Sequence, residues 1–149
     1  MKRIFLVLFF QVFICLNSFG FTFYVQTVNG KEYSDLTPEE KEIIASLEDG
    51  VMDNLFEGGH IFFSLIPGTD ITAPLEAGLN AGADFVIIIK PDLSNSIVNF
   101  EILDTASRKK IGSGILSGNN VRDAAELSIK DLFYKFGVEL TQQVFVLIQ

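Results

Sequence analysis

Apolar and polar positions along the chain first predict a set of strands. Residues 21–28 alternate apolar and polar side chains, as in a half-buried strand, and Asn29-Gly30 closes it. Residues 60–66 form a short apolar run that Pro67-Gly68 stops. Residues 85–89 are apolar on both faces and mostly β-branched, which favours a strand in the middle of a covered sheet.

Two further strands are predicted to follow residues 85–89 as an antiparallel meander. Residues 97–104 alternate again after a turn-forming segment, and residues 111–117 come after a second turn. Gly112 and Gly114 fall on the face opposite Ile111 and Ile115, which leaves room for a bulge or a close neighbour.

A long helix is predicted to begin after Thr37. Thr37 is followed by Pro38 at the first helical position and by Glu40 at the third, which is a capping-box arrangement. Gly50 should weaken this helix, and Gly58-Gly59 should end it. Apolar residues recur inside it at three- and four-residue spacing, at Ile43, Ile44, Leu47, Val51, Leu55 and Phe56.

The remaining segments complete the expected order. Residues 72–82 fit a short helix, and Asn120 is expected to cap a third helix that ends near Gly137. Residues 138–148 are expected to finish the chain as an apolar strand, or else as a further helical segment. The prediction is a single α+β domain with a mixed, mostly antiparallel sheet covered by helices, in the order strand, helix, strand, helix, three-stranded meander, helix, strand.

Residues 1–20 are predicted to be a secretory signal peptide. Lys2 and Arg3 precede an apolar run over residues 4–16, and Ser18-Phe19-Gly20 supplies small residues for cleavage. The thirteen-residue run would span roughly 20 Å, which is short of the roughly 30 Å hydrocarbon core that a membrane anchor must cross. A second alternative is lipidation of Cys15, because residues 12–15 loosely resemble a bacterial lipobox.

Composition limits the class of protein and of partner. Residues 21–149 form one predicted domain with 19 acidic and 9 basic residues and no cysteine, so disulfide and thiol chemistry are excluded there. The full chain has a formal charge of −8, which argues against a nucleic-acid surface because phosphate binding needs clustered basic residues. We expect no cofactor, and membrane contact only through the signal peptide.

The segment after residues 85–89 contains a weak metal-site candidate. Asp92, Ser94 and Ser96 have the Asp-x-Ser-x-Ser spacing with which some domains bind a divalent cation. The same residue types are also common in hairpin turns, and a strand pattern follows directly. The turn is therefore the preferred interpretation.

His60 is the sole histidine of the chain, so any histidine-dependent catalysis must use it. Ser64, Asp70 and Asp84 could complete a hydrolase site around it, but no nucleophile-elbow, metalloprotease or phosphate-loop motif accompanies them. We expect a structural histidine and no enzymatic activity.

Two charged segments are candidate partner surfaces. Residues 31–57 contain nine acidic residues and two lysines. Within this segment, Glu42, Asp49 and Asp53 of the long helix are the residues expected to contact a basic partner. Arg108 and Lys109, followed by Lys110, form a basic turn of opposite sign. The alternative for both is an ordinary solvated surface.

Four short motifs carry a family resemblance. They are Ala81-Gly82-Ala83-Asp84 before the core strand, Val98-Asn99-Phe100-Glu101-Ile102-Leu103-Asp104, Lys109-Lys110-Ile111-Gly112, and Asp123-Ala124-Ala125 on the following helix. Together, over residues 35–137, they resemble the small envelope domain shared by the TolB N-terminal region, the LpoB-type activators of penicillin-binding proteins and the CsgG-like secretion lipoproteins. The resemblance implies a periplasmic, non-enzymatic interaction module without catalytic residues.

The sequence therefore predicts an exported adaptor or assembly factor that binds another envelope protein through the acidic helix or through a sheet edge. A periplasmic carrier of a small ligand or lipid, in an apolar cleft between sheet and helices, is the alternative from another class.

Overall fold

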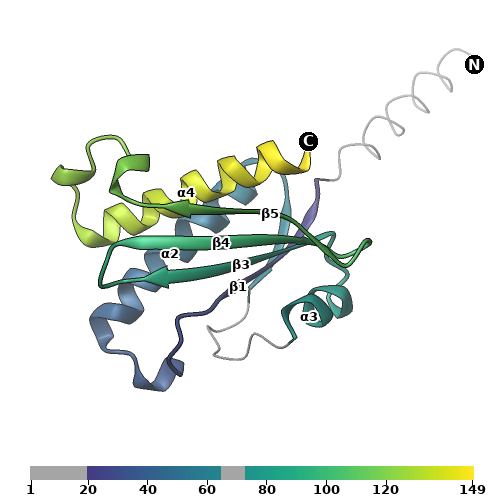
Figure 1. Ribbon diagram of the computed structural model, residues 1–149, viewed down its shortest axis with the longest axis horizontal. Coiled ribbons are helices and arrows are strands. Elements are labelled where there is room, and N and C mark those ends of the chain that lie inside the picture. The colour runs from purple at the N-terminus through teal and green to yellow at the C-terminus, as the bar shows by residue number, and fades with distance from the viewer. Residues whose placement is uncertain (1–19, 65–72) are drawn as a thin grey trace, which may run out of the picture.

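The computed structural model describes residues 20–64 and 73–149, which form one α+β domain around a five-stranded mixed sheet (Figure 1). The predicted signal peptide, including Cys15, and residues 65–72 lie outside the described residues, except for Gly20. The sheet order is β2-β1-β3-β4-β5. The strands are β1 (Thr22–Thr27), β2 (Ile61–Ser64), β3 (Phe85–Asp92), β4 (Ile97–Asp104) and β5 (Lys109–Leu116).

Connections between the strands explain why the sheet is mixed. Helix α2 (Pro38–Glu57) joins β1 to β2, and α3 (Pro74–Asn80) lies between β2 and β3. Because such crossovers return the chain to the same end of the sheet, β1 is parallel to both β2 and β3. Tight turns join β3 to β4 and β4 to β5, and both pairs are antiparallel. The α+β class and the meander are confirmed. The sheet is mixed as expected but not mostly antiparallel, because two strand pairs are parallel and two are antiparallel.

One face of the sheet is covered by α2 and by α4 (Ile129–Ile148), which pack against each other (Figure 1). Their apolar stripes meet the inward side chains of β1, β3, β4 and β5 in the main core. Its largest fully buried members are Phe23, Phe100, Phe133, Phe136, Leu47, Leu55, Ile87 and Leu140. Burial of these apolar side chains supplies the main driving force for folding.

The opposite face is covered over only part of its area. Helix α3 packs there on a smaller cluster that includes Tyr24, Val86 and Ile88. A Cβ at Gly78 would collide with the Val86 side chain, so glycine allows α3 to lie close to the sheet. Beyond α3, the same face of β4 and β5 carries exposed side chains such as Ile115, which is 66% exposed.

Helix α2 begins as the sequence predicts. The Thr37 hydroxyl accepts a hydrogen bond from the Glu40 backbone N–H at 3.2 Å, and the Glu40 carboxylate accepts one from the Thr37 N–H at 2.8 Å. Gly50 does not interrupt the helix. A Cβ there would collide with the Tyr134 carbonyl oxygen, and one at Gly137 would collide with the Leu47 carbonyl oxygen, so the two glycines let α2 and α4 approach backbone to backbone.

The third predicted helix is present but begins and ends later than expected, and the last predicted strand is wrong. Asn120 ends a 3₁₀ turn, η2 (Gly118–Asn120), and a second turn, η3 (Ala124–Glu126), follows Asp123, whose left-handed φ of 59° interrupts any helix begun earlier. Helix α4 starts after Ser128, whose hydroxyl accepts from the Asp131 N–H at 3.2 Å. It continues through Gly137 to Ile148, so residues 138–148 adopt the helical alternative.

The physical reason for this correction is tertiary packing. The four-residue spacing of Phe133, Gly137, Thr141 and Phe145 continues across the position where a glycine was expected to end the helix. Because α2 lies against Gly137, the glycine serves as a contact point instead of a terminus. Residues 138–148 therefore add no strand to the sheet, and β5 lies at its edge among the described residues.

The expected space beside Gly112 and Gly114 is confirmed. The register shifts between Ile102 and Leu103 of β4, which leaves Ile111 of β5 as an extra residue without a partner in β4. Leu147 of α4 lies over Gly112, and the Phe100 ring lies beside Gly114. Within the described ranges, no helix has the length and apolar character needed to cross a membrane.

Candidate functional site

The edge strand β5 and the uncovered sheet face beside it form a feature that packing within the domain does not explain. Asn99 and Glu101 of β4, and Ser113 and Ile115 of β5, lie on this face together with Lys90 of β3. They border a hollow of about 550 Å³. Lys90 Nζ and Glu101 Oε1 are 3.4 Å apart, so its floor carries an ion pair.

No backbone partner is found for the outer edge of β5 among the residues that the structure describes. β5 is eight residues long, whereas the edge strand at the other side, β2, has four residues. An unpaired edge can accept an additional strand through its backbone N–H and C=O groups. A sheet edge was among the surfaces expected from the sequence, but the strand order that puts β5 at that edge could not be predicted, and only the glycine and isoleucine alternation over 111–115 marked this segment.

The basic turn lies at the beginning of β5. Lys109 and Lys110 are its first two residues and are exposed. Arg108 Nη1 lies 3.5 Å from Glu76 Oε1 of α3, and both side chains are more than half exposed. The predicted partner residues Arg108 and Lys109 are therefore continuous with the edge strand.

The acidic helix surface is partly used within the domain. Glu42 forms an ion pair with Lys130 of α4, and the Tyr134 hydroxyl donates a hydrogen bond to Asp53 Oδ2 at 3.1 Å. That hydrogen bond, followed by burial and the negative charge of Asp53, raises the pKa of Tyr134. The Asp49 side chain is exposed and forms no hydrogen bond or ion pair within the described chain. The three predicted residues thus do not form one free acidic surface.

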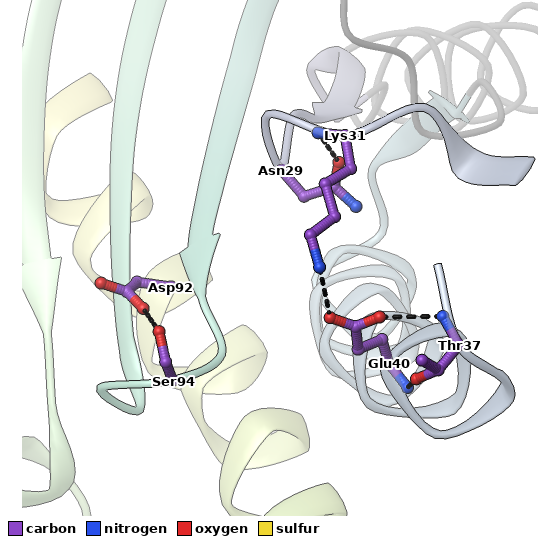
Figure 2. A network of polar contacts seen from close by, with 6 residues as sticks. All are labelled: Asn29, Lys31, Thr37, Glu40, Asp92 and Ser94. Atoms are coloured by element: carbon purple, nitrogen blue, oxygen red, sulfur yellow. Dashed lines mark hydrogen bonds and ion pairs between the residues drawn. The ribbon is translucent and has the colours of Figure 1, made fainter. Parts of the chain in front are cut away.

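A second candidate site is a polar cleft of about 480 Å³ at the carboxyl ends of the parallel strands β1 and β3. Figure 2 shows Asp92 and Ser94 on one side of this region and Asn29, Lys31 and Glu40 on the other. Ligands commonly bind beside the carboxyl ends of parallel strands, because the loops that leave them diverge there.

Lys31 and Glu40 form one wall of this cleft. Lys31 Nζ lies 2.9 Å from Glu40 Oε1. The hydrogen bond from Lys31, followed by the one from the Thr37 backbone, lowers the pKa of Glu40 to about 2. Glu40 is therefore ionised at neutral pH and already has two donors (Figure 2).

Asp92 organises the turn between β3 and β4. Its Oδ1 accepts from the Ser94 hydroxyl at 2.7 Å and from the Asn95 N–H at 3.1 Å, and its Oδ2 accepts from the Asn95 side-chain amide at 2.7 Å. These bonds, led by that of Asn95, lower the pKa of Asp92. Ser96 has a left-handed φ of 51° and completes the turn. Within residues 20–64 and 73–149, no group of three or more His, Cys, Asp or Glu side chains could hold a metal ion.

His60 lies in an aromatic cluster between the start of β1 and the end of α4. Its ring contacts those of Phe21, Phe23 and Phe145 at centroid distances of 6.0, 5.4 and 4.9 Å. Burial lowers the pKa of His60, and Nδ1 accepts a hydrogen bond from the Phe21 N–H at 3.0 Å. This geometry requires the neutral ring with its proton on Nε2.

The structure does not assemble the hydrolase residues around His60. Asp84 Oδ2 accepts from the Thr22 N–H at 2.8 Å. Ser64 is at the opposite end of β2 from His60, and Asp70 lies outside the described residues. His60 and Asp84 therefore both hold the beginning of β1.

Comparison with known proteins gives distant structural similarities. No family model matches the chain. No curated protein matches it significantly. The chain is similar to lipoprotein GNA1162 from Neisseria meningitidis, with 16% identity, a TM-score of 0.46, and coverage of 84% of this chain and 98% of that one. Protein XCC0632 from Xanthomonas campestris has 13% identity, a TM-score of 0.49, and coverage of 87% and 85%.

TolB from Acinetobacter baumannii shows a weaker similarity, with 14% identity and a TM-score of 0.37. The match covers 81% of this chain and 28% of TolB. These bacterial proteins include a lipoprotein and a member of the group that the sequence motifs resemble. At such identities and scores they assign neither a family nor a function to this chain.

Proposed function

We propose that this protein is an exported, non-catalytic protein-interaction module of the bacterial cell envelope, and that β5 with the open sheet face beside it is its docking surface. The observation that carries the proposal is the eight-residue edge strand without a backbone partner in the described chain. Export is supported by the signal-peptide pattern of residues 1–20.

The chemistry of this surface suits protein recognition. Ile115 is 66% exposed at the rim of the hollow, and the Lys90–Glu101 ion pair lies within it. A strand added to β5 would gain main-chain hydrogen bonds, and its side chains would bury part of Ile115.

Site-specific photo-cross-linking in growing cells tests the proposal. A photoreactive amino acid is placed at Ser113 in β5 or, as a control, at the exposed Lys135 in α4. We expect a reproducible adduct with one envelope protein at Ser113 and none at Lys135. Absence of an adduct at Ser113, or equal adducts at both positions, would contradict the proposed docking surface.

A carrier of a small polar ligand is the second candidate function, and the polar cleft at the carboxyl ends of β1 and β3 supports it. Its lining combines the Lys31 ammonium, the Asp92 carboxylate and the Ser94 hydroxyl. Native mass spectrometry of protein purified from its own envelope fraction tests this function. A bound molecule of defined mass that is lost in an Asp92→Ala variant would support it, and ligand-free protein would count against it.

A further inference from the structure

The edge of β5 is not uniform, and its two halves differ in their ability to pair. The first half contains Lys109 and Lys110 and faces the register shift near Ile102, and both lysines and bulges discourage strand addition. The second half, from Gly112 to Leu116, has no charge, no proline and no register shift. A strand can therefore pair most readily with residues 112–116.

Apolar contacts are available on both sides of this second half. Ile115 lies on the open face. On the other face, Leu147 of α4 covers Gly112 and remains 44% exposed. Because successive side chains of a strand point to opposite faces, an added segment can place one apolar residue against Ile115 and another near Leu147.

The two ends of β5 differ in charge, because the strand begins with Lys109 and Lys110 and its second half is uncharged. The chain carries a net charge of −8, yet residues 108–110 are three consecutive basic residues. Asp104, the β4 partner of Lys109, accepts hydrogen bonds from the N–H groups of Ala106 and Ser107, so its carboxylate serves the turn. No ion pair of Lys109 or Lys110 is found in the described chain.

From this arrangement we propose that the partner of β5 is an extended acidic segment of another protein. Its apolar residues alternate along Gly112–Leu116, and its carboxylates lie beside Lys109 and Lys110. This inference rests on the proposed function, which it makes specific by giving the chemistry of the bound segment. The acidic surface of this chain, by contrast, would repel such a segment from α2.

Selection from a random peptide library tests the inference. Displayed twelve-residue peptides are selected against the chain that remains after residue 20, and peptides with two or more acidic residues next to an alternating apolar run are expected to be enriched. Binding of an enriched peptide should weaken about fivefold or more in Lys109→Glu/Lys110→Glu, because the reversal replaces two charge attractions with repulsions. Arg122→Glu/Lys135→Glu provides the same change of net charge at other exposed positions and should leave binding unchanged.

Amide hydrogen exchange then locates the bound peptide. We expect slower exchange over residues 112–116 and no change in β2. Peptides without acidic residues, equal weakening in both charge-reversal pairs, or protection elsewhere would overturn the inference. Concentration-dependent dimerisation through β5 would also overturn it, because the occupant would then be a second copy of this acidic chain.

The two proposals can fail separately. If Ser113 captures an envelope protein in cells while the library yields no acidic peptide, the docking surface stands and the acidic-segment inference is wrong. If neither experiment gives a product at β5, both are wrong.

Discussion

At the scale of single residues, glycine positions decide how closely the elements pack. Gly50 and Gly137 lie where α2 and α4 touch, and both are buried. The sequence alone indicated a weak point in one helix and the end of another. Gly50 and Gly137 are 87 positions apart in the sequence, and their role is to let the backbones of α2 and α4 touch. A local sequence pattern cannot predict a contact between such distant residues.

Substitution of Gly50 or Gly137 by alanine should therefore destabilise the domain. The new Cβ would press on a main-chain carbonyl oxygen of the facing helix, so the helices must separate. We expect a loss of about 2 kcal/mol in the free energy of unfolding, measured by urea denaturation. Gly118→Ala is the control, because its Cβ would lie 3.7 Å from the Ala124 Cβ in ordinary contact. Stability of Gly50→Ala equal to that of the control would contradict the close crossing.

His60 should make stability depend on pH. Because its pKa is lowered in the folded protein from 6.5, the unfolded chain binds a proton first as the pH falls. The free energy of unfolding should then decrease below about pH 6.5, until the pH reaches the folded pKa. Well above pH 6.5 the ring is neutral in both states and this contribution is fully present.

The difference between parent and His60→Asn isolates this effect, since asparagine can still accept the Phe21 hydrogen bond. Burial raises the pKa of Glu48, so its contribution to stability decreases as the pH rises above about 4.5, which is opposite to the effect of His60. Both proteins contain Glu48, so its contribution cancels when their free energies of unfolding are subtracted. Urea unfolding between pH 5 and 8 should show a smaller decrease in the variant. Identical pH profiles would contradict the buried, neutral His60.

At the scale of elements, the start of a helix could be predicted where the capping residues lie within one turn of each other in the sequence. The start of α2 followed from Thr37 and Glu40, three residues apart. The start of α4 depends on Ser128 and Asp131 in the same way, but the more prominent Asn120 drew the prediction to an earlier residue. The terminal segment was harder to assign, because a buried apolar run fits a strand or a helix until its neighbour is known.

The cap of α2 gives a prediction at this scale. Thr37→Ala removes the acceptor for the Glu40 N–H and should lower the free energy of unfolding by about 1 kcal/mol. Thr37→Ser retains a hydroxyl and should stay near the parent value. Chemical denaturation of the three proteins checks this order, and an alanine variant as stable as the parent would show that the cap contributes nothing.

At the scale of the whole molecule, the α+β class and the central strand could be predicted from the sequence, whereas the candidate site could not. Lys109 was recognised as a possible partner residue, but the edge to which it belongs is evident only from the strand order of the sheet. The acidic surface predicted from composition is divided by contacts of Glu42 and Asp53 with α4. Net charge indicates what a surface attracts, and tertiary contacts determine which charges remain available.

Recovery of partners by two surface variants tests the docking surface most directly. Tagged parent, Ile115→Lys and Asp49→Lys are expressed at equal levels in the native host, cross-linked, and analysed by quantitative mass spectrometry. Both side chains are exposed, so both variants should fold. We expect Ile115→Lys to lose the envelope partner and Asp49→Lys to retain it. Full recovery with Ile115→Lys and loss with Asp49→Lys would place docking on the acidic helix and contradict it.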